Sequence, residues 1–301
     1  MNPLFATWAM IVLSTLFWGS NFNAGQALAD DLPALTAAAE RFSIGMFMFL
    51  ALRCWQGKAE SHLRLRDLLV LAPFGLLGVA GFNYAFFVAL HTTSALNAAL
   101  IMALSPLVSV LLSALLLKTR ITAAQLVGMA LAFAGVSLVI TDGHFGQLHV
   151  AVGDLWMLFG CLAWSLYSVG SKRYAPQVPP LQFARWTVGI GSLTLIVAAL
   201  LLEQPLPQLA KATPSTHTLL LYMGTCGSFL AYIFWLKGVH ALGPDKAAIA
   251  FNLVPVFTLL VNLLLGKLPD AVQVAGLVIV LGGVLIFNGW RPLPAWRKQP
   301  V

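Results

Sequence analysis

Long apolar runs follow one another along almost the whole chain and are separated by short polar or charged clusters. A hydrocarbon core about 30 Å thick needs about 20 apolar residues per helix. The connections are too short for another domain. The pattern therefore predicts an all-α integral membrane protein with ten transmembrane helices, at residues 5–27, 33–55, 67–90, 93–117, 122–141, 152–174, 180–202, 216–240, 244–266 and 270–290.

Composition agrees with this pattern. Of the 301 residues, 59% are hydrophobic and 9% are charged, and the mean hydropathy is +0.87, which lies outside the balance of soluble domains. A net charge of +7 would suggest nucleic acid on a soluble protein, but here the basic residues lie between apolar runs. We therefore expect a lipid bilayer and no nucleic acid as partner. The three cysteines form no CxxC pair, so neither a disulfide framework nor a metal site is expected.

The distribution of lysine and arginine predicts the orientation in the membrane. With a cytoplasmic N-terminus, thirteen basic residues fall in inside loops, helix ends or the tail, and only Lys211 and Lys267 fall outside. This bias follows the positive-inside rule, so we expect both termini in the cytoplasm. Ala27-Leu28-Ala29 resembles a signal-peptidase site, but residues 1–16 contain no lysine or arginine. We therefore expect a retained first span.

The two halves of the chain repeat one another, and the stretch from Tyr84 to Gly128 matches the stretch from Tyr232 to Gly276 with one-residue slippage. Each half contains five apolar runs, an odd number, so the second half must enter the membrane from the opposite side. We therefore expect a five-plus-five inverted repeat, with residues 1–146 as the first unit and 147–301 as the second. Such repeats place a substrate site at their interface near the midplane and allow alternating access. The matched positions are Trp18 with Trp164, Arg41 with Arg185, Tyr84 with Tyr232, Pro106 with Pro255, and Gly128 with Gly276.

This organisation resembles the drug/metabolite transporter superfamily, specifically its EamA-type exporters. The resemblance rests on the five-plus-five helices, the tryptophan after a small-residue patch in each half, and the paired mid-helix prolines, and it covers nearly the whole chain. It implies a multi-pass carrier of the cell inner membrane that exports amino acids or related metabolites against proton entry. The family often carries an acidic residue after the fourth and ninth helices, where this chain has Lys118 and Lys267. No role of that acid is carried over.

Aromatic and polar residues share one face of the first helix of each half. Trp18, Asn21 and Phe22 fall at positions i, i+3 and i+4. Amides deep in lipid should face inward, toward a cavity or a partner helix. We expect a site for a neutral or aromatic amino acid, although interfacial anchoring and interhelical hydrogen bonding would produce the same residue types. The predicted substrate-binding residues are Trp18, Asn21, Asn83, Tyr84, Phe87, Asn97, Trp164, Tyr167, Ser168, Tyr232, Trp235 and Asn252.

Two adjacent charges lie inside the second predicted helix. Glu40 and Arg41 are about 10–12 Å below its outer end at 1.5 Å per residue, and ionisable residues at such depth are functional candidates. We expect Glu40 to take part in proton coupling and Arg41 to pair with an acid or a substrate carboxylate. The alternative is a structural ion pair or snorkelling.

Pro106 and Pro255, midway along their helices, are candidate hinges, or kinks that only fix packing.

Other classes of function fit the sequence less well. An intramembrane enzyme would need a chemical constellation within the spans, and the chain has no HExxH and no pair of buried aspartates. We therefore expect no enzyme activity and no cofactor. The inverted repeat favours a carrier over a channel. A non-transporting scaffold or partner subunit and an uptake carrier of the same fold stay open as alternatives.

Overall fold

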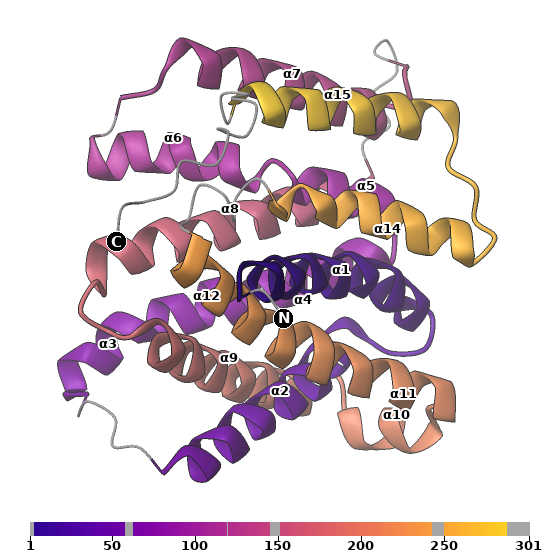
Figure 1. The fold of residues 1–301 in the computed structure, drawn as a ribbon. Helices are drawn as coiled ribbons and strands as arrows, with labels where there is room; N and C mark the ends of the chain where they lie inside the picture. Colours follow the sequence, from indigo (N-terminus) through magenta and orange to yellow (C-terminus); the bar gives the residue numbers. More distant parts are fainter. Residues whose placement is uncertain (1–2, 58–62, 119, 145–150, 243–249, 288–301) are drawn as a thin grey trace.

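The computed structural model describes residues 3–57, 63–118, 120–144, 151–242 and 250–287, and each regular element in these ranges is a helix (Figure 1). Within these ranges, eight helical stretches are long and apolar enough to cross a membrane, and two shorter apolar helices, Leu253–Leu264 and Ala271–Phe287, follow them. The structure agrees with the predicted all-α membrane class. The ten crossings and the orientation of the termini stay predictions.

Most helix boundaries lie close to those of the apolar runs. The first half contains α1 (Pro3–Ala29), α2 (Ala34–Gln56), α3 (Leu65–Pro73), the π-helix η1 (Phe74–Gly81), α4 (Phe82–Leu90), α5 (Ala95–Met102), α6 (Ser105–Leu117) and α7 (Ala123–Ile140). The second half contains α8 (Val152–Tyr174), α9 (Pro180–Leu202), α10 (Pro205–Lys211), α11 (Pro214–Tyr222), the π-helix η2 (Met223–Leu230), α12 (Ala231–Leu242), α14 (Leu253–Leu264) and α15 (Ala271–Phe287). The short helix α10 lies between two apolar runs and was not predicted.

Two long stretches each contain a π-helical segment in the middle. α3, η1 and α4 follow one another directly, as do α11, η2 and α12. A Cβ atom on Gly227 would lie 1.9 Å from Asn21 Nδ2, and one on Gly78 would lie 2.4 Å from the Tyr167 ring. Without side chains at these glycines, α1 and α8 can pack directly against the π-helices. Both π-helices carry glycine at their second and fifth positions, Gly75 and Gly78 in η1 and Gly224 and Gly227 in η2.

The two candidate hinge prolines lie at the start of helix segments. Pro106 is in the first turn of α6, and Pro255 is the third residue of α14. Proline is tolerated there because the first amide groups of a helix have no intrahelical acceptor. The fourth predicted helix is therefore two segments, α5 and α6, and the carbonyl of Ser105, the first residue of α6, accepts a hydrogen bond of 3.1 Å from Ser165 Oγ.

Equivalent helices of the two halves make equivalent contacts. α1 packs against α12 and α14, and α8 packs against α4, α5 and α6. α2 packs against α9 and η2, while α9 packs against η1. In Figure 1, α1, α4 and α12 lie in the middle of the molecule, between the layer that contains α2 and α9 and the layer that contains α7 and α15. The centre of the molecule is therefore built from both halves.

α7 and α15 lie side by side at one edge of the molecule (Figure 1). A Cβ on Gly128 would lie 2.5 Å from the Gly283 carbonyl oxygen, and a Cβ on Gly283 would lie 2.7 Å from the Gly128 carbonyl oxygen. Gly135 and Gly276 face each other in the same way, at 2.9 and 3.0 Å. Small residues of this kind allow two helix backbones to approach closely in a membrane.

Candidate functional site

A chamber at the centre of the molecule is lined mainly by aromatic side chains. Together with the open solvent at its mouth, the space between these side chains is about 540 Å³. Both halves of the chain contribute to its walls. The lining residues are Trp18, Asn21, Phe22, Arg41, Phe42, Phe82, Asn83, Phe86, Met102, Trp164, Tyr232, Phe251 and Val254.

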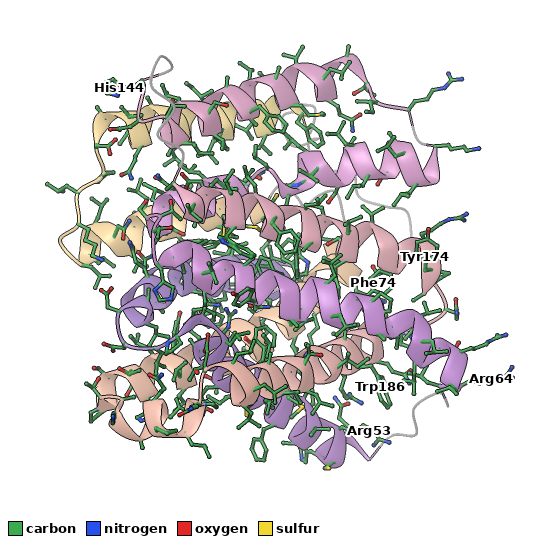
Figure 2. All side chains as sticks on the ribbon, turned by 180° about the vertical axis from the view of Figure 1, so that it is seen from behind. Arg53, Arg64, Phe74, His144, Tyr174 and Trp186 are labelled. Carbon is green, nitrogen blue, oxygen red and sulfur yellow. The ribbon has the colours of Figure 1, made fainter. Side chains whose placement is uncertain are left out.

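A wider vestibule adjoins the chamber and shares Trp18, Trp164 and Tyr232 with it. It leads to the end of the molecule where α8 meets α9, and its walls there include Ala175, Pro176, Val178 and Pro180. Seen from behind, Tyr174 at this end lies on the same side of the molecule as Arg53 and Arg64, opposite His144 (Figure 2). The vestibule therefore lies between the chamber and the end that carries these arginines.

Three aromatic residues separate the chamber from the vestibule. The ring of Tyr232 stands edge-on to Trp18, at 5.9 Å between centroids, and edge-on to Trp164, at 6.2 Å. Trp18 Nε1 donates a hydrogen bond of 3.1 Å to the carbonyl oxygen of Gly227 in η2. The indole N–H of Trp18 is thus occupied, and its ring remains to contact a bound molecule. Trp18, Trp164 and Tyr232 are three of the residues predicted for the site.

Arg41 is the charged member of the chamber wall. Its side chain is 5% exposed. Nε donates a hydrogen bond of 2.9 Å to Ser228 Oγ, and Nη1 donates one of 3.3 Å to Asn83 Oδ1. The guanidinium carbon also lies 5.5 Å from the centre of the Phe86 ring. All these partners are uncharged, so the chamber wall carries a net positive charge at this point.

The two amides in the chamber wall differ in their bonding. Asn83 Nδ2 donates to the Val79 carbonyl at 2.8 Å, and its oxygen accepts from Arg41, so the side chain is held in place from both ends. Asn21 is buried beside Gly227, and neither its nitrogen nor its oxygen has a hydrogen-bond partner in the described structure. Because a buried amide without partners is costly, Asn21 is available to a ligand.

Three predicted residues lie in the vestibule rather than in the chamber. They are Tyr167, Ser168 and Trp235. Tyr167 stacks on Trp164 at 5.5 Å between centroids, and its hydroxyl is 3.1 Å from Thr187 Oγ1. Trp235 packs against Trp18 at 5.2 Å. These residues would meet a molecule on its way to the chamber.

Four predicted site residues line neither space. Tyr84 points away from the chamber and packs edge-on against Trp156, at 5.5 Å between centroids. Phe87 is buried against Phe86. Asn97 accepts a hydrogen bond of 3.0 Å from Gln273 Nε2, which joins the two halves. Asn252, whose amide also has no partner in the described structure, lies at the break before α14.

Glu40 lies on a different face of α2 from Arg41. It is partly exposed, does not line the chamber, and its carboxylate makes no hydrogen bond within the residues that the structure describes. Adjacent residues on a helix point about 100° apart, which accounts for this separation. The described structure therefore contains no ion pair between Glu40 and Arg41, and the coupling role of Glu40 stays a prediction.

Sequence reasoning missed most of the apolar wall of the chamber. Phe82, Phe86 and Phe251 carry no polar group that would distinguish them from the many other phenylalanines in the spans. Ser228, which holds Arg41, lies in a π-helix that hydrophobic periodicity does not predict. The one available signal was the G-x-x-G pattern that η1 and η2 share.

The end of the molecule opposite the vestibule is closed by hydrogen bonds between the halves. Glu203 accepts bonds from the backbone nitrogens of Leu35 and Thr36, at 3.1 and 2.7 Å, and from the Thr36 hydroxyl at 3.0 Å. Two aspartates accept from threonine hydroxyls in the same region, Asp31 from Thr216 and Asp154 from Thr93. Each of these bonds joins the first half to the second, so three polar contacts, defined here as a polar layer, link the halves at this end.

Comparison with known protein families finds one family model that matches the chain twice. The EamA-like transporter family matches residues 6–141 and, a second time, residues 151–289. A transporter of Bacillus subtilis, named "Uncharacterized transporter YyaM", is 32% identical over 294 residues, which are 96% of this chain and 96% of that protein. A relative from Streptantibioticus cattleyicolor is 25% identical, over 94% of this chain and 93% of its own, and is named "Probable terminal-alkyne amino-acid exporter".

A solved crystal structure is similar to the whole chain. It has a TM-score of 0.65 and 22% sequence identity, and the match covers 92% of this chain and 99% of that one. At this level of identity the likeness concerns the fold alone. It supports the helical arrangement described above.

Proposed function

Because the chain belongs to the EamA-like transporter family, we propose that this multi-pass membrane transporter exports amino acids with neutral or aromatic side chains, or related metabolites, across a cell inner membrane. The observation that carries the proposal is the central chamber, whose wall combines Trp18, Trp164 and Tyr232 from both halves. The name of the Streptantibioticus relative, an amino-acid exporter, supports the same substrate class.

The proposed mechanism is alternating access by a five-plus-five inverted repeat. Equivalent contacts in the two halves, the paired π-helices and the paired breaks before the prolines all support this symmetry. α14 and α15 would be the ninth and tenth membrane spans. Pro106 and Pro255, at the start of separate helix segments, would serve as hinges.

We assign the structure to the state that is open toward the cytoplasm. Arg53 and Arg64 lie at the end to which the vestibule leads, as the positive-inside rule requires for a cytoplasmic face (Figure 2). The polar layer of Glu203, Asp31 and Asp154 would then close the outer face. Substrate would enter the vestibule from the cytoplasm and leave after this layer opens.

Counterflow in proteoliposomes tests the proposal. Proteoliposomes that contain the purified protein are preloaded with unlabelled amino acids, from threonine to tryptophan. They should exchange these for labelled substrate in a saturable manner. Trp18→Ala and Trp164→Ala should each lower the exchange rate about tenfold, because each removes a ring from the chamber wall. A matched control is Trp186→Ala, since Trp186 lies on α9 outside both the chamber and the vestibule. Absence of exchange for the whole panel by folded protein would refute the proposed function.

Proton coupling through Glu40 is a separate part of the proposal. In that case export should be driven by an inward proton gradient, and Glu40→Gln should abolish this drive while leaving counterflow, which needs no net proton movement, close to normal. Measurement of net efflux at two outside pH values distinguishes the two steps. Unchanged pH dependence in the Glu40→Gln protein would exclude this role.

A further inference from the structure

We propose that the chamber recognises its cargo through one carboxylate, which binds at Arg41 and Asn21, and that an ammonium group on the cargo is not required. The cargo class would then be monocarboxylates with an apolar or aromatic body, of which zwitterionic amino acids are one case. This inference rests on the proposed transport function and narrows its substrate class.

The first reason is the state of the Arg41 guanidinium. It is buried, it lines the chamber, and its two hydrogen bonds go to the neutral Ser228 and Asn83. Within the residues that the structure describes, no carboxylate lies within 4 Å of it, and Nη2 makes no hydrogen bond. A buried cation is costly unless an anion is close to it, so a bound carboxylate would supply the anionic partner that the protein does not provide.

The second reason is the position of Asn21. This side chain packs on Gly227, and Arg41 bonds to the next residue of η2, Ser228. The π-helix therefore brings the unpartnered amide and the guanidinium to neighbouring parts of the chamber wall. A carboxylate has two oxygens and accepts several hydrogen bonds. It could accept from Arg41 Nη2 with one oxygen and from Asn21 Nδ2 with the other.

The third reason is what the rest of the wall contains. Of its thirteen residues, none is an aspartate or glutamate, and Arg41 is the one cation. An ammonium would have no ionic partner in this wall, and a second carboxylate would have none either. Most of the remaining surface consists of aromatic rings and alkyl groups, which suits an apolar body. An ammonium could gain affinity through cation–π contact with Trp164 or Tyr232 and through a hydrogen bond to the Asn21 oxygen, neither of which is an ionic pair.

The structural alternative is that Arg41 serves only packing. Its guanidinium lies near the rings of Phe42 and Phe86, and it bridges α2 to η2 and α4. Both roles make loss of Arg41 harmful to the fold. A decisive test must therefore compare ligands that differ only in charge, on protein that has not been changed.

The experiment is isothermal titration of the detergent-solubilised intact protein with four compounds that share one phenylethyl skeleton. They are 3-phenylpropanoate, 3-phenylpropanamide, phenylalanine and phenethylamine. We expect 3-phenylpropanoate and phenylalanine to bind within about threefold of each other, and the amide and the amine to bind at least about tenfold more weakly, because they lack the charge-assisted hydrogen bonds.

Variants then locate the effect. Arg41→Gln should bind 3-phenylpropanoate and its amide equally, while Asn21→Ala, which keeps the guanidinium, should reduce the preference for the carboxylate only in part. The matched control is Arg185→Gln. Arg185 is the repeat-related arginine, and it lies beside Trp186 and Arg53, outside the chamber. Its loss should leave the ranking of the four ligands unchanged.

Two results would overturn the inference while leaving transport intact. One is binding of phenylalanine or phenethylamine more than tenfold tighter than binding of 3-phenylpropanoate, which would indicate a site for the ammonium. The other is an Arg41→Gln protein that folds and keeps the full preference for carboxylate over amide. Absence of binding by all four ligands would also refute it, and the counterflow panel would then decide separately whether the transport proposal stands.

Discussion

At the centre of the molecule, two side chains each pack against a glycine, which has no side chain of its own to fill the space. Asn21 rests on Gly227 and Tyr167 rests on Gly78, at equivalent places in the two halves. The first helix of each half thereby reaches the π-helix of the other. The chemistry differs between the two places, since one position holds an amide and the other a phenol. The site is therefore asymmetric even though the packing around it is repeated.

Gly227→Ala should destabilise the protein by about 1–3 kcal/mol, because an added methyl overlaps Asn21 Nδ2 and forces a local shift. Thermal unfolding in detergent, followed by near-UV circular dichroism, measures the effect. Gly282→Ala is the matched control, since nothing lies within 4 Å of the position that its Cβ would occupy. Asn21→Ala combined with Gly227→Ala should recover part of the loss; a fully additive double variant would show that the two residues do not interact.

The structure brings some of the predicted site residues together at one chamber and directs others away from it. Trp18, Trp164 and Tyr232 do meet at the chamber, and Arg41 does face it. Tyr84, Phe87 and Asn97 do not, because one residue along a helix turns the side chain by about 100° and a single sequence does not reveal how a helix is rotated against its neighbours. Asn83 and Tyr84 illustrate this, since the first lines the chamber and the second packs on Trp156.

At the level of helices, hydrophobic length was sufficient to locate the elements. The predicted ranges 152–174 and 180–202 coincide with α8 and α9. The hydrophobic pattern did not predict η1 and η2. One extra residue in a helical turn hardly changes the pattern of a run that is apolar on all sides. The pattern also predicted one helix where the structure has α5 and α6. The sequence alone does not show that α5 ends before Pro106, so this proline was interpreted as a kink.

Among the contacts between helices, the one between Glu203 and the start of α2 can be tested most directly. Its carboxylate accepts from two backbone N–H groups that have no acceptor within the helix. Glu203→Gln should weaken this contact by about 1–2 kcal/mol, because one acceptor and the negative charge are lost. In the proposed orientation, the outer end of the molecule should then open more often.

Accessibility of the chamber from outside measures that shift. In a protein without its native cysteines, Met102→Cys should react with a membrane-impermeant maleimide faster when Glu203→Gln is present. Asp270→Asn is the control, since Asp270 accepts from the backbone nitrogen of Gln273 within the same half. Equal labelling rates in the two backgrounds would mean that Glu203 does not hold the outer end closed.

On the scale of the whole molecule, the proposed orientation makes a direct prediction about one native residue. Cys54 is exposed and follows Arg53 near the end of α2, so it should lie in the cytoplasm. With Cys161 and Cys226 replaced by alanine and serine, intact cells should leave Cys54 unlabelled by an impermeant maleimide, and inside-out vesicles should label it. A Lys211→Cys variant, also lacking Cys54, should show the reverse. Labelling of Cys54 in intact cells would show that the membrane topology is the inverse of the one proposed.

The pairing of α7 with α15 has a further consequence. The glycines meet reciprocally, Gly128 with Gly283 and Gly135 with Gly276, and the sequence repeat makes Gly128 the counterpart of Gly276. One patch thus contacts a copy of itself, which is the definition of an isologous interface. In the proposed inverted repeat, two separate five-helix chains inserted in opposite directions could dimerise through such a patch. Co-expressed as separate polypeptides, residues 1–146 and 147–301 should therefore assemble and co-purify without the covalent link between them.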